Sequence, residues 1–99
     1  MTDTHVNFLT IWAETPYARR LLGWLSRHVQ IDEPSYEDGV LTPAVEAPEW
    51  LFNVLRGQID RTLQAYETTP GLARWYWMAV TLELSAAESN LSRAVYGDR

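Results

Sequence analysis

Apolar residues recur along most of the chain at intervals of three and four positions, the pattern of helices that bury one face. Residues 16–30, PYARRLLGWLSRHVQ, follow this pattern most regularly. The apolar side of this predicted helix carries Tyr17, Ala18, Leu21, Leu22, Trp24, Leu25, His28 and Val29. The opposite side carries Arg19, Arg20, Gly23, Ser26, Arg27 and Gln30. We therefore predict a helix over 16–30 whose apolar side enters the core.

Residues 48–66 and 70–96 predict two longer helices. The first has a broad apolar face formed by Trp50, Leu51, Val54, Leu55, Ile59, Leu63 and Tyr66. Its polar residues Asn53, Arg56, Asp60 and Gln64 are expected to face water. The second helix is apolar nearly all round in its first half, so we expect it to be central in the fold. Gly97 is its predicted C-cap.

A narrower apolar seam runs along the second half of the last predicted helix. Its members are Val80, Leu84, Ala87, Leu91 and Ala94, separated by four and three positions in turn. This spacing is typical of coiled coils, but the seam extends over only about two heptads. We expect it to pack against the chain's own helices, with a homodimer interface as the alternative.

Three Thr-Pro pairs, at 15–16, 42–43 and 69–70, indicate helix starts. Thr is a favoured N-cap, and Pro is favoured at the first helical position. Residues 4–14 predict a short helix, although alternating apolar residues there would also suit a strand. Residues 31–47 hold most of the acidic residues together with proline and glycine. They predict a long loop between the second and third helices, with one short turn after Thr42.

These segments together predict one all-α domain over residues 1–99, a compact bundle of three to four helices with an acidic loop at 31–47. A chain of 99 residues fits one domain with one core. Its start, Met1-Thr2-Asp3, has no secretory signal pattern, and the longest apolar run, 72–84, is too short for a membrane span. We expect a cytoplasmic protein without membrane contact, a monomer in preference to a homodimer.

The net charge of −5 is concentrated in one segment. Residues 32–50 carry six acidic residues and no basic residue, whereas the rest has seven acidic and eight basic residues. Nucleic-acid-binding domains usually show the opposite balance. The segment is either a solvated loop or a surface for a protein partner with a basic surface, with two aromatic anchors beside the carboxylates. The candidate partner-binding residues are Asp32, Glu33, Tyr36, Glu37, Asp38, Glu46, Glu49 and Trp50.

No motif for catalysis, metal binding or cofactor binding stands out. The chain has no Cys, its five Gly are scattered, and it lacks the GxSxG and HExxH patterns. His28 and Glu83 are the best candidates for an acid–base pair, because both are predicted among apolar residues. The alternatives are a histidine that is hydrogen-bonded to a carbonyl group, and a glutamate that pairs with an arginine such as Arg19 or Arg61 or that faces solvent. We expect no enzymatic activity, no metal and no cofactor.

Two compositional features bear on binding. All eight basic residues are Arg, and Arg19, Arg20 and Arg27 share one face of the helix predicted over 16–30. This leaves DNA binding through a helix-turn-helix as a minor alternative to the expected absence of direct nucleic-acid contact. The five Trp are many for this length, and we expect one or two of them near the surface, where Trp often anchors a partner.

These features favour non-catalytic protein binding. The most concrete form is an inhibitor that occupies a basic surface of a nucleic-acid-handling protein or a toxin. In size, acidity and lack of catalytic motifs the chain is similar in type to phage and mobile-element inhibitors, such as anti-CRISPR, immunity and antirestriction proteins. No motif of a particular family is present. The alternatives are a helical homodimeric regulatory or structural protein, and a small enzyme that uses His28 and Glu83.

Overall fold

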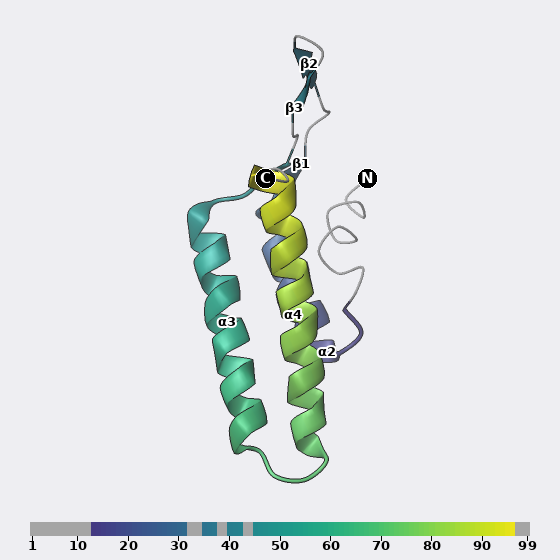
Figure 1. Ribbon diagram of the computed structural model, residues 1–99, viewed down its shortest axis with the longest axis vertical. Coiled ribbons are helices and arrows are strands. Elements are labelled where there is room, and N and C mark those ends of the chain that lie inside the picture. Colours follow the sequence, from purple (N-terminus) through teal and green to yellow (C-terminus); the bar gives the residue numbers. More distant parts are fainter. Residues whose placement is uncertain (1–12, 32–34, 38–39, 43–44, 97–99) are drawn as a thin grey trace.

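The computed structural model describes residues 13–31, 35–37, 40–42 and 45–96, which form three helices and four short strands (Figure 1). The helices are α2 (Pro16–Ser26), α3 (Glu49–Thr68) and α4 (Ala73–Tyr96). The strands are β1 (Gln30–Ile31), β2 (Ser35–Glu37), β3 (Val40–Thr42) and β4 (Val45–Glu46). The described chain is mostly helical, which agrees with the predicted helical class. Of the helix predicted over 4–14, only residues 13 and 14 are described, and Gly97 also lies outside the described residues.

Helix α2 begins where the first Thr-Pro pair predicts. Thr15 is its N-cap: the Thr15 hydroxyl accepts a hydrogen bond from the amide of Ala18, and Pro16 occupies the first helical position. The helix ends at Ser26, four residues before the predicted end. The reason is tertiary, since Gln30 and Ile31 leave the helical path and pair with β4.

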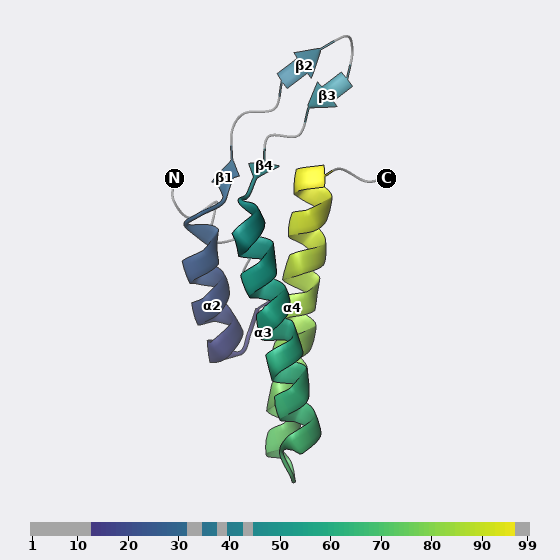
Figure 2. The same cartoon turned by 90° about the vertical axis from the view of Figure 1, so that its left-hand side faces the viewer.

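The segment predicted to be an acidic loop contains two antiparallel strand pairs, so that prediction is wrong for its described part. β1 pairs with β4, and β2 pairs with β3. The register sets Glu37 opposite Val40, which leaves Asp38 and Gly39 between the two strands. An Asp-Gly pair between two short runs is a strong sequence signal for a hairpin. Figure 2 shows β2 and β3 beyond β1 and β4, away from the helices.

Helices α3 and α4 form an antiparallel hairpin. Thr42 and Thr69 do not begin helices: Thr42 ends β3, and Thr69 is the C-cap of α3. The connection to α4 contains Gly71 at φ 74°, a left-handed conformation that favours glycine. Helix α4 therefore starts at Ala73, three residues later than predicted.

The core lies between α2 and the half of the α3–α4 hairpin that is nearest the strands (Figure 2). Its buried apolar members are Ala13, Ala18, Leu22, Leu25, Val29, Leu51, Phe52, Leu55, Val80, Leu84, Ala87 and Leu91. Four of the five residues of the predicted seam, from Val80 to Leu91, are thus buried within the chain, and Ala94 is half-buried. A second chain cannot reach these four side chains unless the helices separate.

Helix α2 is too short to cover the whole hairpin. It has 11 residues against 20 in α3 and 24 in α4, or about 16 Å against about 30 and 36 Å. Helix α4 contacts both other helices, as its predicted central position requires. Contrary to the prediction for its first half, however, Trp75 is 57% exposed and Leu82 is 61% exposed.

Candidate binding surface

Three aromatic rings meet on the surface between the end of α2 and the start of α3. The ring centroids of Trp24 and His28 are 5.3 Å apart, those of His28 and Trp50 are 5.0 Å apart, and those of the two tryptophans are 6.1 Å apart. We call these three residues the aromatic platform. Trp24 is 47% exposed and Trp50 is 42% exposed, so much of each indole faces solvent.

The geometry of the platform limits what it can hold. The rings cross at 53° to 73°, with centroid separations typical of directly packed aromatic pairs. A cation cannot enter between rings that already touch. The outward faces of the two indoles remain available, and they suit a flat or apolar group of a partner or a cation stacked from outside.

Sequence position and local packing together produce this arrangement. Ala18, Leu22, Leu25 and Val29 form the buried stripe of α2 and the turn that follows it. Trp24 and His28 lie one helical turn apart along one edge of that stripe. Trp50 stands in the first turn of α3, which follows Pro48. The sequence prediction that Trp24 and His28 enter the core is therefore wrong, because the stripe that α2 buries is narrower than its apolar side.

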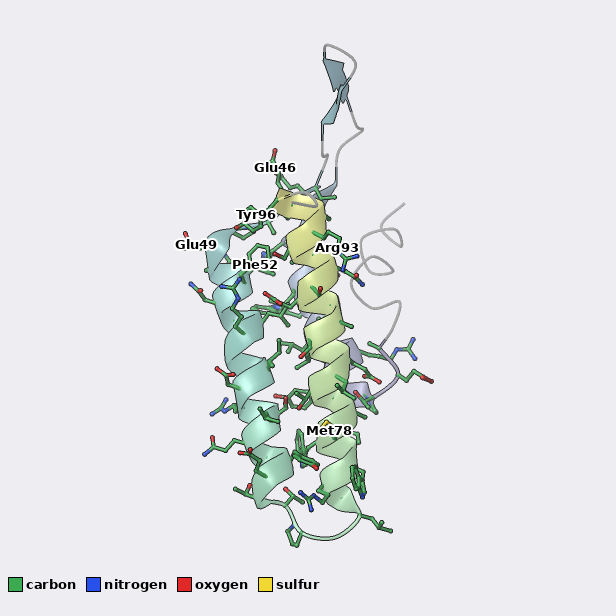
Figure 3. All side chains as sticks on the ribbon, viewed as in Figure 1. Glu46, Glu49, Phe52, Met78, Arg93 and Tyr96 are labelled. Atoms are coloured by element: carbon green, nitrogen blue, oxygen red, sulfur yellow. The ribbon has the colours of Figure 1, made fainter. Side chains whose placement is uncertain are left out.

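Charged and polar groups border the platform. A shallow cavity of about 490 Å³ adjoins it at His28 and is lined by Arg27, His28, Gln30, Glu46, Ala47 and Pro48. Glu46 on β4 and Glu49 in the first turn of α3 are both exposed. Figure 3 shows these two glutamates at the same end of the helical body, beside Tyr96. Neither forms an ion pair with another described residue.

The predicted partner-binding residues fall into three groups. Glu46 lines the cavity at His28, Trp50 belongs to the platform, and Glu49 precedes Trp50 in the first turn of α3. Tyr36 and Glu37 are described only by their positions in β2, where they pair with Leu41 and Val40. Asp32, Glu33 and Asp38 lie outside the described residues. Sequence reasoning did not place Trp24 and His28 on the surface. The available signal was their spacing of four positions, which sets them side by side at the edge of the buried stripe.

The candidate acid–base pair does not form. His28 follows the C-terminal end of α2 and packs against Trp24 and Trp50. Glu83 lies at the opposite end of α2, where Oε1 accepts hydrogen bonds from the amide and the hydroxyl of Thr15, at 3.1 and 2.7 Å. Glu83 therefore tethers the start of α2 to α4 instead of pairing with Arg19 or Arg61. An enzyme that uses His28 and Glu83 together has no support in this geometry.

A second group of aromatic residues lies towards the far end of the hairpin. The Arg74 guanidinium stacks 4.5 Å from the ring centroid of Tyr66 and 5.8 Å from that of Trp75. The hydroxyl of Tyr76 accepts a hydrogen bond from the amide of Tyr17, and the Tyr76 ring packs on Trp77. These contacts fasten α4 to α2 and α3.

The remaining candidates are dispersed. Arg19, Arg20 and Arg27 are exposed on α2 and at its C-cap. Within the described residues, no group of three His, Asp or Glu side chains gathers in an arrangement that could hold a metal ion. None of the described helices combines the length and the hydropathy needed to cross a membrane.

Fold and surface together define a small protein whose described residues form three helices and carry an exposed aromatic platform, with Glu46 and Glu49 next to it. No protein-family model matches the chain, and neither the curated proteins nor the solved structures contain a significant match to it. Its function must therefore be inferred from its own geometry.

Proposed function

We propose that this protein is a non-catalytic protein-binding inhibitor, and that the aromatic platform with Glu46 and Glu49 is its binding surface. The partner is a protein with a basic surface, such as a nucleic-acid-handling protein or a toxin. The observation that carries the proposal is the direct contact of Trp24, His28 and Trp50 in a cluster that leaves both indoles more than two-fifths exposed.

An exposed tryptophan keeps apolar surface in contact with water, and burying that surface at an interface is favourable in free energy. Trp is strongly enriched among the residues that dominate binding energy. Both indoles of the platform are already restrained by contact with His28. A restrained side chain loses little conformational entropy on binding, so the contact area converts more fully into affinity.

The carboxylates supply the preference for a basic partner. Glu46 and Glu49 are exposed and without an ion-pair partner among the described residues. Residues 32–50 contain six acidic residues and no basic one. Their field attracts a basic protein and raises the rate of encounter, while the indoles slow dissociation. An arginine of the partner can stack on an indole and pair with a glutamate at the same time. Such an arginine uses both the aromatic rings and the carboxylates of this surface.

Inhibition follows if the occupied surface is the one that the partner uses for nucleic acid. Carboxylates that cover such a surface compete with phosphates for the same cationic side chains. This is the mode of action that we propose, and it belongs to the type found among phage and mobile-element inhibitors, including anti-CRISPR proteins. A partner of this kind acts in the cytoplasm, which is the compartment that we propose for this protein.

The first experiment tests the platform. The wild-type chain is used as bait in a lysate of its native host, and the captured protein is then purified for binding measurements. We expect the W24A and W50A variants each to weaken binding by at least about 30-fold. Trp75→Ala is the matched control, because Trp75 is 57% exposed at the far end of the hairpin. Equal losses for W75A and the platform variants would overturn the proposal.

The second experiment tests the electrostatic part. One variant, E46Q/E49Q, neutralises the two carboxylates beside the platform, and the control, D60N/E67Q, neutralises two exposed carboxylates elsewhere on α3. Both variants lose the same charge, so only the location differs. We expect the first to bind more weakly and with a flatter salt dependence, and the control to resemble wild type. If both behave alike, net charge rather than this surface attracts the partner.

A further inference from the structure

His28 is the one member of the aromatic platform that can change its charge. Its ring centroid lies 5.3 Å from that of Trp24 and 5.0 Å from that of Trp50, at interplanar angles of 71° and 73°. The residue is exposed, so the imidazole exchanges protons freely with solvent. Histidine is the side chain whose charge ordinarily changes between about pH 5 and 8. The platform therefore contains a titratable ring in contact with both indoles.

A protonated His28 places a positive charge against both indoles. A cation within about 6 Å of a ring centroid is attracted by the π electrons of that ring. The imidazole lies within this distance of Trp24 and of Trp50. The imidazolium therefore acts on the indoles from inside the platform. A cation of a partner that stacks on the outward face of either indole is then repelled by a positive charge on the other side of the same ring.

The charged groups around His28 come from three elements. Arg27 is the C-cap of α2, Glu46 lies on β4, and both line the cavity that adjoins His28. Glu49 lies in the first turn of α3. No carboxylate of a described residue lies at ion-pair distance from His28. With a neutral imidazole, these three neighbours carry one more negative charge than positive charge. A protonated His28 cancels that excess.

We propose that His28 regulates the binding surface through pH: the neutral imidazole permits binding of a basic partner, and the imidazolium weakens it. This inference rests on the proposed function, because it concerns the affinity of that surface for a basic protein. Both effects of the imidazolium, on the indoles and on the local charge, act in the same direction.

The size of the effect follows from the separation of the charges. Two unit charges about 4 Å apart change an affinity by about 5-fold even when water screens them fully, and by more when water is partly excluded. We therefore expect a basic probe to bind at least about 5-fold more weakly at about pH 5.5 than at about pH 8. The comparison stops at about pH 5.5, above the range in which exposed carboxyl groups ordinarily take up protons.

The first test needs no partner. The indole N–H signals of the isotope-labelled chain are assigned with tryptophan-to-phenylalanine variants and followed by NMR from about pH 8 to 5.5. We expect the signals of Trp24 and Trp50 to shift along one titration curve, and that of Trp75, at the far end of the hairpin, to stay in place. His28→Asn should abolish the shift, whereas His5→Asn should retain it. Unmoved platform signals, or the same movement in H28N, would overturn the proposal.

The second test measures affinity, with hexa-arginine as the basic probe. We expect the probe to shift the signals of Trp24 and Trp50, with a dissociation constant at least about 5-fold higher at about pH 5.5 than at about pH 8. In H28N the constants at the two pH values should be nearly equal. His28→Arg carries a permanent charge and should bind the probe at the higher pH as weakly as wild type does at the lower one. Circular dichroism confirms that each variant is folded.

The two tests separate failure of this inference from failure of the proposed function. If the platform signals titrate but hexa-arginine binds equally well at both pH values, regulation by pH is overturned and the binding surface stands. If the probe shifts the signal of Trp75 as strongly as those of Trp24 and Trp50, the binding surface itself is contradicted, and its regulation is overturned with it.

Discussion

The hydroxyl of Thr15 lies 2.7 Å from Oε1 of Glu83, although 68 positions separate the two residues in the sequence. The same hydroxyl accepts a hydrogen bond from the amide of Ala18 and so also caps α2. One side chain therefore begins the helix and fixes it to α4. The same carboxylate oxygen receives the amide of Thr15 at 3.1 Å, which makes Glu83 part of the start of α2.

This relationship predicts a coupled loss of stability. Thr15→Ala removes the cap and the hydrogen bond from the hydroxyl to Glu83, while the backbone amide keeps its own hydrogen bond to Glu83. It should lower the free energy of unfolding by about 1–2 kcal/mol. Glu83→Ala should cost a similar amount, because it leaves the Thr15 amide without its acceptor. Denaturant unfolding of the single and double variants should give a double-variant loss clearly smaller than the sum. Thr15→Ser keeps the hydroxyl and should stay close to wild type; strict additivity would contradict the tether.

A second prediction concerns two buried hydroxyls between α3 and α4. Thr81 Oγ1 lies 2.8 Å from Thr62 Oγ1 and 2.7 Å from the carbonyl oxygen of Trp77. Thr62→Val or Thr81→Val alone leaves one hydroxyl with fewer partners and should cost about 1–2 kcal/mol. The double valine variant removes both polar groups at nearly constant volume. It should be at least as stable as either single variant in thermal unfolding, and a larger loss in the double variant would contradict this account.

Two glycines should respond in opposite directions to alanine. Gly57 is exposed within α3, and an added Cβ there meets no atom within 4 Å. Gly57→Ala should raise the free energy of unfolding by about 0.5–1 kcal/mol through improved helix propensity. Gly71 has the same open surroundings but a φ of 74°, so Gly71→Ala should lower stability by about 1 kcal/mol or more. Urea titrations of the two variants measure the contrast directly.

Replacing leucine by alanine should lower the free energy of unfolding by different amounts on the two faces of α4. Leu84 is completely buried in the core, and Leu84→Ala should cost about 2–5 kcal/mol. Leu82, two positions earlier, is 61% exposed, and Leu82→Ala should change the stability of the monomer by no more than about 0.5 kcal/mol. The measurement is denaturant unfolding at low micromolar protein. A large loss for L82A under these conditions would mean that another part of the chain covers Leu82.

Much of the helical architecture was predictable because its signals are local. The three- and four-residue spacing located α2, α3 and α4 to within a few residues, and Thr15-Pro16 marked the start of α2 correctly. The strands were missed because each has only two or three residues, too few for an alternating pattern to be visible. The Asp38-Gly39 pair was a usable sequence signal for a hairpin. The segment was nevertheless predicted to be a loop, because acidic residues are concentrated around that pair.

The candidate surface was predictable only in part. Glu46, Glu49 and Trp50 were expected to act together because they are close in the sequence. Trp24 and His28 were assigned to the core because their positions fit the apolar side of α2. Their exposure follows from packing: the groove that receives α2 encloses Ala18, Leu22 and Leu25, and leaves the edge of that side in contact with Trp50.

By itself, then, the sequence determined which of the described segments are helical, where α2 begins and where negative charge is concentrated. Each of these depends on residues within about one or two helical turns of one another, a range over which spacing and composition carry the information. Only the tertiary structure decided which apolar residues remain exposed, that Glu83 holds Thr15, and that α2 leaves half of the hairpin uncovered. Those outcomes depend on contacts between distant segments and on the relative lengths of packed helices, which no local pattern specifies.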